Sequence, residues 1–155
     1  MSKKIFYLLL FFFLSNCGYE AIYSKKNIKY FNFSINELIF TGDRKVNIKL
    51  KEKLFNYTKK EKLVTFNLLI NTEVIKTISA KDALGDPTIF QLEVRIIVKV
   101  LNQQDLHITT LNYVEKYKYR NDNNRVELKK YEDEVKTSIA ETFAKEISLS
   151  LSRIR

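Results

Sequence analysis

The chain offers one thiol and one imidazole, and these limit the chemistry that it could carry. Cys17 is the only cysteine and His107 the only histidine. A disulfide within the chain needs two thiols, and a metal site needs several converging N, S or O ligands. A Ser/His/Asp triad would have to use His107, but no Gly-x-Ser-x-Gly turn presents a serine. The sequence therefore predicts no catalytic residue, no metal site and no cofactor.

Carboxylates and glycines do not change this prediction. The densest group of acids is Glu132, Asp133 and Glu134. Adjacent residues of a helix fan around its circumference and do not converge on one point. We therefore expect these three acids to be solvent-exposed helix surface. The glycines lie far apart along the chain, so no phosphate-binding loop is predicted.

Cys17 lies in the context of a lipid-modified residue. Lys3 and Lys4 precede an apolar run, Ile5 to Leu14, that is too short to span a membrane comfortably, and Ser15-Asn16-Cys17 follows. This pattern is typical of a bacterial lipoprotein signal, which is cut before a cysteine that is then acylated. Asn16 departs from the usual Gly or Ala. An ordinary secretory signal with an incidental cysteine, or an uncleaved apolar anchor, are the alternatives.

The signal predicts the organisation and the location of the chain. Residues 1–16 form the lipoprotein signal peptide, residues 17–29 the lipidated N-terminus and a tether, and residues 30–155 a single domain. Attached acyl chains contribute about 0.8 kcal/mol per buried methylene, so several together anchor a protein stably. Gly18 follows the cysteine, where an Asp would favour the inner membrane. We therefore expect a lipid anchor at the periplasmic face of the outer membrane.

The chain is basic, with 27 Lys and Arg against 18 Asp and Glu and a formal charge of +9. The charge falls to +7 when Lys3 and Lys4 leave with the signal. Such a balance favours an anionic partner, namely nucleic acid, a membrane surface or a phosphorylated glycolipid. An A/T-rich genome, which enriches Lys, Asn and Ile together, is the alternative source of this charge. An exported lipoprotein would meet little nucleic acid, so no nucleic-acid partner is expected.

Hydrophobic periodicity predicts the elements that would position any site. Alternation predicts strands over residues 30–40, 64–74, 90–100 and 107–119. Apolar positions at helical spacing predict helices over residues 43–57, with Asp43 as the N-cap, and over residues 128–154. Residues 79–87 are predicted to form a loop, and the short polar connection 102–105 predicts an antiparallel hairpin. Side chains predicted to share one face of the last strand are Leu111, Tyr113, Tyr117 and Tyr119.

These elements predict an α+β fold. In this order, β-α-β-β-β-α, two helices should pack on one face of a four-stranded, mainly antiparallel sheet to give a two-layer sandwich. The other face of the sheet should contact either water or another protein.

In this order of elements the chain resembles the lipopolysaccharide-assembly lipoprotein family (LptE). The resemblance rests on Cys17-Gly18-Tyr19, on Gly42-Asp43-Arg44 at the first helix, on Thr88-Ile89-Phe90-Gln91-Leu92 and on the periodic last helix. It spans essentially the whole mature chain. The resemblance implies a protein that is not an enzyme. Members of the family sit as a plug inside the outer-membrane β-barrel LptD, help it assemble and take part in passing lipopolysaccharide to the outer leaflet.

Lipopolysaccharide is phosphorylated, so Lys and Arg projecting from a loop or a sheet end are the physical candidates for binding it. These candidates are Lys81, in the loop between the second and third strands, and Lys129 and Lys130, at the start of the last helix. Arg95, on the polar face of a strand, is a further candidate. For each of them, an ordinary solvated side chain or a contact with the barrel lumen is the alternative.

Other classes of function share some of these features. A free periplasmic lipoprotein that binds lipid or cell-wall components without a barrel would have the same anchor, sheet and charge. A membrane-anchored enzyme would need reactive groups that the chain hardly offers. A cationic nucleic-acid binder would require that Ile5 to Leu14 is not an export signal.

Overall fold

The computed structural model describes residues 31–58 and 62–154. Asn32–Arg155 form one compact unit. The predicted signal peptide, Cys17 and the tether lie outside the described residues. None of the helices in the described part of the chain combines the length and the apolar character needed to cross a membrane.

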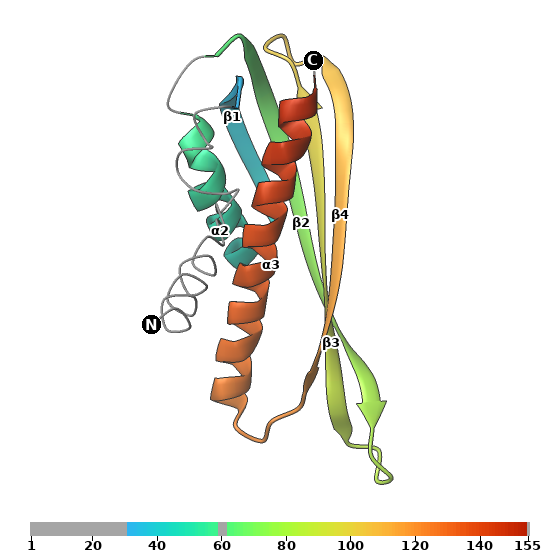
Figure 1. The fold of residues 1–155 in the computed structure, drawn as a ribbon. Helices are drawn as coiled ribbons and strands as arrows, with labels where there is room; N and C mark the ends of the chain where they lie inside the picture. Colours follow the sequence, from blue (N-terminus) through green and yellow to red (C-terminus); the bar gives the residue numbers. More distant parts are fainter. Residues whose placement is uncertain (1–30, 59–61, 155) are drawn as a thin grey trace, which may run out of the picture. The chain divides into compact units, whose positions relative to one another are not determined.

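Within residues 31–58 and 62–154, four strands form a single sheet in chain order (Figure 1). These strands are β1 (Phe33–Gly42), β2 (Val64–Lys81), β3 (Pro87–Leu101) and β4 (His107–Arg120). β1 and β2 are parallel, whereas β2 with β3 and β3 with β4 are antiparallel.

Helices make the second layer of the unit. Helix α2 (Arg44–Leu54) and the 3-10 turn η2 (Phe55–Tyr57) connect β1 to β2, as a parallel pair requires, and α3 (Arg125–Arg153) follows β4. Figure 1 shows α3 running along the sheet with α2 beside it. The predicted α+β fold, its order of elements and its mainly antiparallel sheet are confirmed.

The core lies between the sheet and the helices. Alternate residues of β3 and β2 are buried against the helices, as their alternation predicted, while the residues between them point to the opposite face. The buried apolar side chains of the sheet include Phe66, Leu68, Ile70, Leu92, Val94, Ile96, Val98 and Val100. The helices contribute Val46, Leu50, Leu54, Ile139, Phe143, Ile147 and Leu151. Each fully buried side chain of this kind contributes about 1.5–3 kcal/mol.

The predicted aromatic face of β4 packs under α3. The ring of Tyr113 lies 5.5 Å from that of Phe143, measured between centroids. The ring of Tyr119 lies 5.9 Å from that of Tyr131. Aromatic contacts of this kind add to the stabilisation from burial, so they hold the edge strand β4 to the helix layer.

The turn from β1 to α2 explains why Gly42 and Asp43 occur together. Gly42 has a φ of +95°, and a Cβ there would lie 1.7 Å from the carbonyl oxygen of Thr72 in β2. Asp43 caps α2 as predicted, because its Oδ1 accepts hydrogen bonds from the backbone N–H groups of Lys45 and Val46, both at 3.0 Å. Only glycine fits this close approach of the turn to the neighbouring strand.

Several boundaries differ from the predictions. β1 begins at Phe33 and continues to Gly42, and its register shifts between Ile35 and Glu37, which changes the set of residues facing the core. The first helix ends at Leu54 and gives way to η2. α3 begins at Arg125, three residues earlier than predicted, because the side chain of Asn124 caps it.

The largest correction concerns the β2–β3 hairpin. β2 continues to Lys81, so the predicted loop over residues 79–87 shrinks to residues 82–86. The Asp82 carboxylate closes this loop by accepting hydrogen bonds from the backbone N–H groups of Leu84 and Asp86, both at 2.9 Å. Gly85 supplies the positive φ, +90°, that the turn needs. Lys81 is therefore the last residue of a strand and not a loop residue.

Candidate functional site

The structure overturns the expectation for the first acid of the cluster at the start of α3. Glu132 is 6% exposed. Its Oε1 accepts a hydrogen bond from Lys76 Nζ of β2 and another from the Tyr119 hydroxyl of β4, both at 2.6 Å. The prediction that Glu132 is solvated is wrong because the first turns of α3 direct Glu132 toward the sheet and leave Tyr131 40% exposed. One carboxylate thus joins three elements.

The charges in this cluster are matched. Burial alone would raise the pKa of Glu132, but the hydrogen bonds from Lys76 and Tyr119 outweigh it and lower the pKa below its ordinary value. Burial raises the pKa of Tyr119, and the nearby carboxylate raises it further. Lys76 Nζ also lies 3.9 Å from the centroid of the Phe90 ring. At neutral pH the carboxylate is charged and the phenol protonated, so the cluster acts as a structural clamp.

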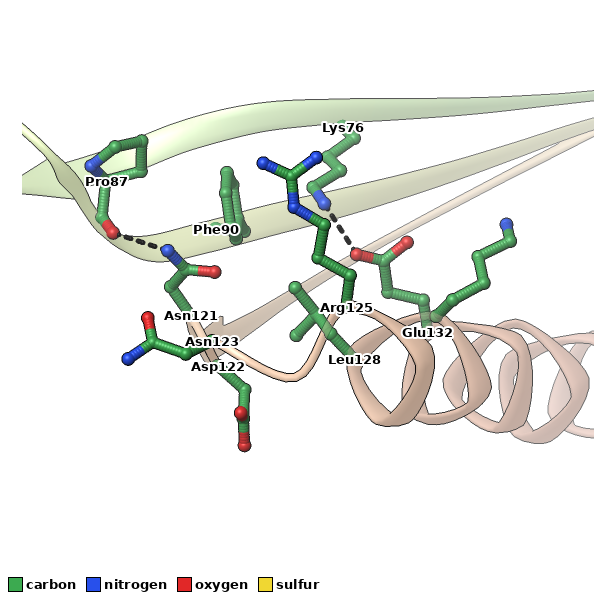
Figure 2. Close-up of a pocket in the computed structure, with 10 residues that line it drawn as sticks. Lys76, Pro87, Phe90, Asn121, Asp122, Asn123, Arg125, Leu128 and Glu132 are labelled. Carbon is green, nitrogen blue, oxygen red and sulfur yellow. Dashed lines mark hydrogen bonds and ion pairs between the residues drawn. The ribbon is translucent and has the colours of Figure 1, made fainter.

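A groove of about 550 Å³ opens beside this clamp (Figure 2). We call it the α3 groove, and it is lined by Lys76, Pro87, Phe90, Asn121, Asp122, Asn123, Arg125, Leu128, Lys129 and Glu132. Phe90 and Leu128 form an apolar part of its wall. The Asn121 side chain donates a hydrogen bond to the Pro87 carbonyl at 2.9 Å, which holds the β4–α3 connection against β3.

The α3 groove contains a cation that the sequence analysis missed. Figure 2 shows Arg125 extending from the first turn of α3 toward the strands. Arg125 and Lys129 are four residues apart, so they lie on the same face of the helix. That spacing could have identified Arg125, but the predicted helix began three residues too late to include it. The third cation of the groove, Lys76, is already paired with Glu132. Arg125 and Lys129 beside the apolar wall suit an anionic group attached to an apolar one.

The predicted cations do not form one site. Lys129 lines the α3 groove, but its Nζ is also 3.5 Å from Asp133 Oδ1. Lys130 lines a second hollow of about 650 Å³ on the other side of Lys129, which also includes Lys45. Lys81 is exposed at the end of β2, where it pairs with Pro87. It therefore lies one strand spacing, about 4.8 Å, from a residue of the α3 groove.

Arg95 lies elsewhere, on the face of the sheet that points away from the helices. Its guanidinium contacts Glu93 at 2.5 Å and Glu73 at 3.3 Å, and Lys116 contacts Glu93 at 3.4 Å. The hydrogen bond from Arg95 lowers the pKa of Glu93. Because two carboxylates already share its charge, Arg95 is the least available of the predicted residues for a phosphate.

The same outer face of the sheet also carries exposed apolar side chains. Ile39, Ile97 and Val114 lie on it, interspersed with the ion pairs around Arg95. Polar pairs and isolated apolar side chains alternate across this face. Such a surface is suited to contact with a polar wall more than to burial in a second apolar core.

His107 has no ligand-like surroundings. Its Nε2 lies 2.9 Å from Thr110 Oγ1, and the ring is exposed. Among residues 31–58 and 62–154, no group of three or more His, Cys, Asp or Glu side chains is placed to hold a metal ion.

Comparisons with known proteins give similarity in fold. No protein-family profile matches the chain, and no curated sequence is significantly similar to it. The rare lipoprotein B of Shewanella oneidensis superposes with a TM-score of 0.55, covering 74% of this chain and 96% of that one at 10% identity. A putative lipoprotein from Caulobacter crescentus superposes with a TM-score of 0.58, covering 81% of this chain and 93% of that one at 11% identity. The chain shares the fold of these lipoproteins.

A third structure agrees with these two. A minor lipoprotein from Acinetobacter baumannii superposes with a TM-score of 0.55 at 12% identity, covering 78% of this chain and 95% of that one. The described domain therefore corresponds to nearly the whole of each of these solved chains. At such low identity the likeness concerns the fold alone.

Proposed function

We propose that this protein is a non-catalytic lipoprotein, acylated at Cys17 and held at the periplasmic face of the outer membrane. It plugs an LptD-like β-barrel, helps that barrel assemble and assists the insertion of lipopolysaccharide into the outer leaflet. The sequence around Cys17 supports the anchor. The fold shared with solved lipoproteins supports the class of protein.

The observation that carries the plug proposal is that the two faces of the sheet differ in what covers them. The helices cover one face, and the other is exposed. The other combines the ion pairs of Arg95 with exposed apolar residues such as Val114. The lumen of an outer-membrane barrel is polar, so a plug must present charged and hydrogen-bonding groups to it. The outer face of the sheet meets this requirement and is the surface that we assign to the barrel.

Contact with lipopolysaccharide would use the opposite layer, at the start of α3. Arg125 and Lys129 of the α3 groove, with Lys81 close by, can pair with phosphate groups. Phe90 and Leu128 provide adjoining apolar surface for the lipid part. Lys130 would contribute through the neighbouring hollow, and Arg95 would serve the barrel contact.

The α3 groove also supports a second candidate, a free lipoprotein that binds a lipid or cell-wall component without a barrel. A groove with cationic and apolar walls can hold an amphiphilic ligand unaided. The two candidates differ in one observable property, because only the plug has a stoichiometric barrel partner.

The experiment is a pull-down of the tagged protein from outer membranes in mild detergent. Mass spectrometry of the partners and of the N-terminal peptide should find a large β-barrel in near-equal amount and a triacylated Cys17. Recovery of an unpartnered protein with an unmodified Cys17 would remove the proposed function.

A matched pair of variants tests which face contacts the barrel. Val114→Glu changes a side chain that is 53% exposed on the outer face, whereas Ile48→Glu changes one that is 55% exposed on α2. We expect the first variant to lose most of the barrel and the second to retain it. Equal recovery with both variants would contradict the assignment of the outer face while leaving the barrel partner intact.

A further inference from the structure

We propose that one end of the domain rests on the lipid bilayer and inserts Leu63 and Leu106 into it. We call this the anchor-side end. It comprises the starts of β1 and β2, the β3–β4 loop and the last turn of α3. The proposal rests on the proposed function in one respect, namely that Cys17 is attached to the membrane.

Contacts within the structure place these segments together. Phe33, the first residue of β1, pairs with Val64, the first of β2. A hollow of about 350 Å³ joins both residues to Leu151 and Ile154 at the end of α3. The β3–β4 loop meets the same end, because Asn67 Nδ2 of β2 donates a hydrogen bond to Asp105 Oδ1 at 2.8 Å. Figure 1 shows the β3–β4 loop and the C-terminus at the same end of the sheet.

Large apolar side chains are exposed at this end on two separate loops. Leu63, immediately before β2, is 89% exposed, and Leu106, immediately before β4, is 65% exposed. Ile108, the second residue of β4, is also exposed. Leucines at such exposure are costly in water, and their gathering at one end from different loops is typical of a surface that meets an apolar phase.

Charge at the anchor-side end fits a lipid surface. Lys62 adjoins Leu63, and the exposed Arg153 lies in the last turn of α3. The nearby acid, Asp105, has its carboxylate occupied by Asn67. Basic residues beside apolar ones are attracted to acidic phospholipid headgroups.

The position of the anchor selects a bilayer over other apolar partners. Fourteen residues, 18–31, lie between Cys17 and Asn32, where the compact unit begins. A chain of this length spans at most about 50 Å. Asn32 itself lines the hollow at the anchor-side end, so this end lies within that reach of Cys17 along the chain. Leu84, which is also 89% exposed, lies at the tip of the β2–β3 hairpin, at the other end of β2. A strand of the length of β2 extends about 60 Å.

The chain itself provides the means of testing this. It contains no Trp and a single cysteine, Cys17. The chain from Cys17 onward can therefore be coupled through that thiol to maleimide-bearing lipid in vesicles that contain acidic phospholipid. Three variants each introduce a single fluorophore: Leu63→Trp, Leu106→Trp and, as the matched control, Leu84→Trp. Circular dichroism and urea unfolding verify that each variant folds.

We expect Trp emission to shift to the blue on coupling in the Leu63→Trp and Leu106→Trp variants. Lipids brominated on their acyl chains should quench it about twofold, because apolar groups at the interface enter about 5–10 Å into the bilayer. The Leu84→Trp variant should show neither effect. If Leu63→Trp fails to fold, Leu106→Trp carries the test.

Two outcomes would overturn the proposal. Absent quenching at positions 63 and 106 would mean that the anchor-side end does not enter lipid, and equal quenching at all three positions would mean that lipid contact is not specific to this end. Blue-shifted emission at positions 63 and 106 before any lipid is added would mean that protein, either another part of the chain or a second copy, covers these leucines. Chemical coupling bypasses cellular acylation, so an unmodified Cys17 in the pull-down would refute the proposed function without deciding this experiment.

Discussion

At the scale of single residues, helix α3 carries two buried charges of opposite sign one turn apart. Glu132 is bound by Lys76 and Tyr119. Lys136, which is also buried, lies 3.4 Å from Asp43 Oδ2 at the cap of α2. A buried charge is costly unless it is paired, so each residue requires its partner from another element. These pairs specify how α3 sits against both β2 and α2.

The Glu132 clamp should make stability depend on pH. We expect Glu132→Gln to lower the free energy of unfolding at pH 7 by about 1–2 kcal/mol, because the amide loses a charged hydrogen bond to the half-exposed Lys76 but can still accept one from Tyr119. The pKa of Glu132 is lowered in the folded state. Its stabilisation is therefore present above the unfolded pKa of about 4.3 and is lost as pH falls through the folded value.

Urea unfolding of the wild type and of Glu132→Gln, at pH 7 and at steps down to pH 3, measures this. The difference between the two proteins should shrink below about pH 4.3, where the unfolded carboxylate begins to protonate. Glu134→Gln is the matched control, since Glu134 is an exposed acid of the same helix. A difference that stays constant over the whole range would show that the charge of Glu132 contributes nothing.

At the scale of elements, Asp43 couples the start of α2 to α3. One carboxylate oxygen caps α2, and the other faces Lys136. The two roles can be separated, because Asn is as good an N-cap as Asp but carries no charge. We expect Asp43→Asn to lose only the stabilisation from the ion pair. Asp43→Ala should lower the free energy of unfolding by about 1 kcal/mol more, because it also removes the cap.

Chemical unfolding of both variants, beside Asn124→Ala at the cap of α3, checks this. The exposed Asn124 side chain caps α3 by accepting hydrogen bonds from the backbone N–H groups of Val126 and Glu127. Asn124→Ala should therefore lower the free energy of unfolding by about 1 kcal/mol. Equal destabilisation by Asp43→Asn and Asp43→Ala would mean that the ion pair with Lys136 accounts for the whole effect and that the cap is dispensable.

The same elements show how far the sequence predicts this fold. The alternation of β3 and the cap at Asp43 were predictable, because both depend on local pattern. The full length of β2 was not, because beyond Val74 the strand is held by pairing with β3 and its residues are mostly polar or exposed. Pairing along the hairpin, not hydrophobic alternation, sustains this part of the strand.

The candidate site was predictable only in part. Lys129 and Lys81 were identified as cations near the start of α3 and the β2–β3 hairpin, but the α3 groove is built by residues from three separate segments of the chain. The Glu132 clamp was not predicted, because Glu132 and Tyr131 both fit the helical spacing of the buried residues. Only packing against Tyr119 decides which of the two is buried.

At the scale of the whole domain, opposite ends differ in chemistry. Leu63 and Leu106 are exposed at the end from which the chain leads to Cys17, whereas Lys81, Arg125 and Lys129 lie around the start of α3 and the hairpin. A protein anchored at one end can thereby hold its cationic groove away from the bilayer surface. This arrangement fits the proposed role in lipopolysaccharide insertion, because the proposed anchor and the groove would not compete for the same surface.

The proposed function assigns lipopolysaccharide binding to the cations around the start of α3, and this assignment can be tested by removing their charges. We expect the triple variant Lys81→Gln, Lys129→Gln and Lys130→Gln to bind about tenfold more weakly, since three exposed charge contacts of roughly 0.5 kcal/mol each sum to that factor. Adding Arg125→Gln should weaken binding further. Arg95→Gln should have little effect, because Glu93 and Glu73 already share that charge.

A matched triple variant separates these positions from net charge. Lys51, Lys99 and Lys118 are exposed lysines outside the α3 groove and the neighbouring hollow, so their change to Gln removes the same charge. Titration with lipopolysaccharide at two salt concentrations should show a loss of affinity for the first triple variant and a much smaller one for the second, with both differences reduced at high salt. If both triple variants lose affinity equally, overall charge and not the start of α3 attracts the ligand. If neither does, the lysines are solvated surface, and the groove must be assigned to another ligand.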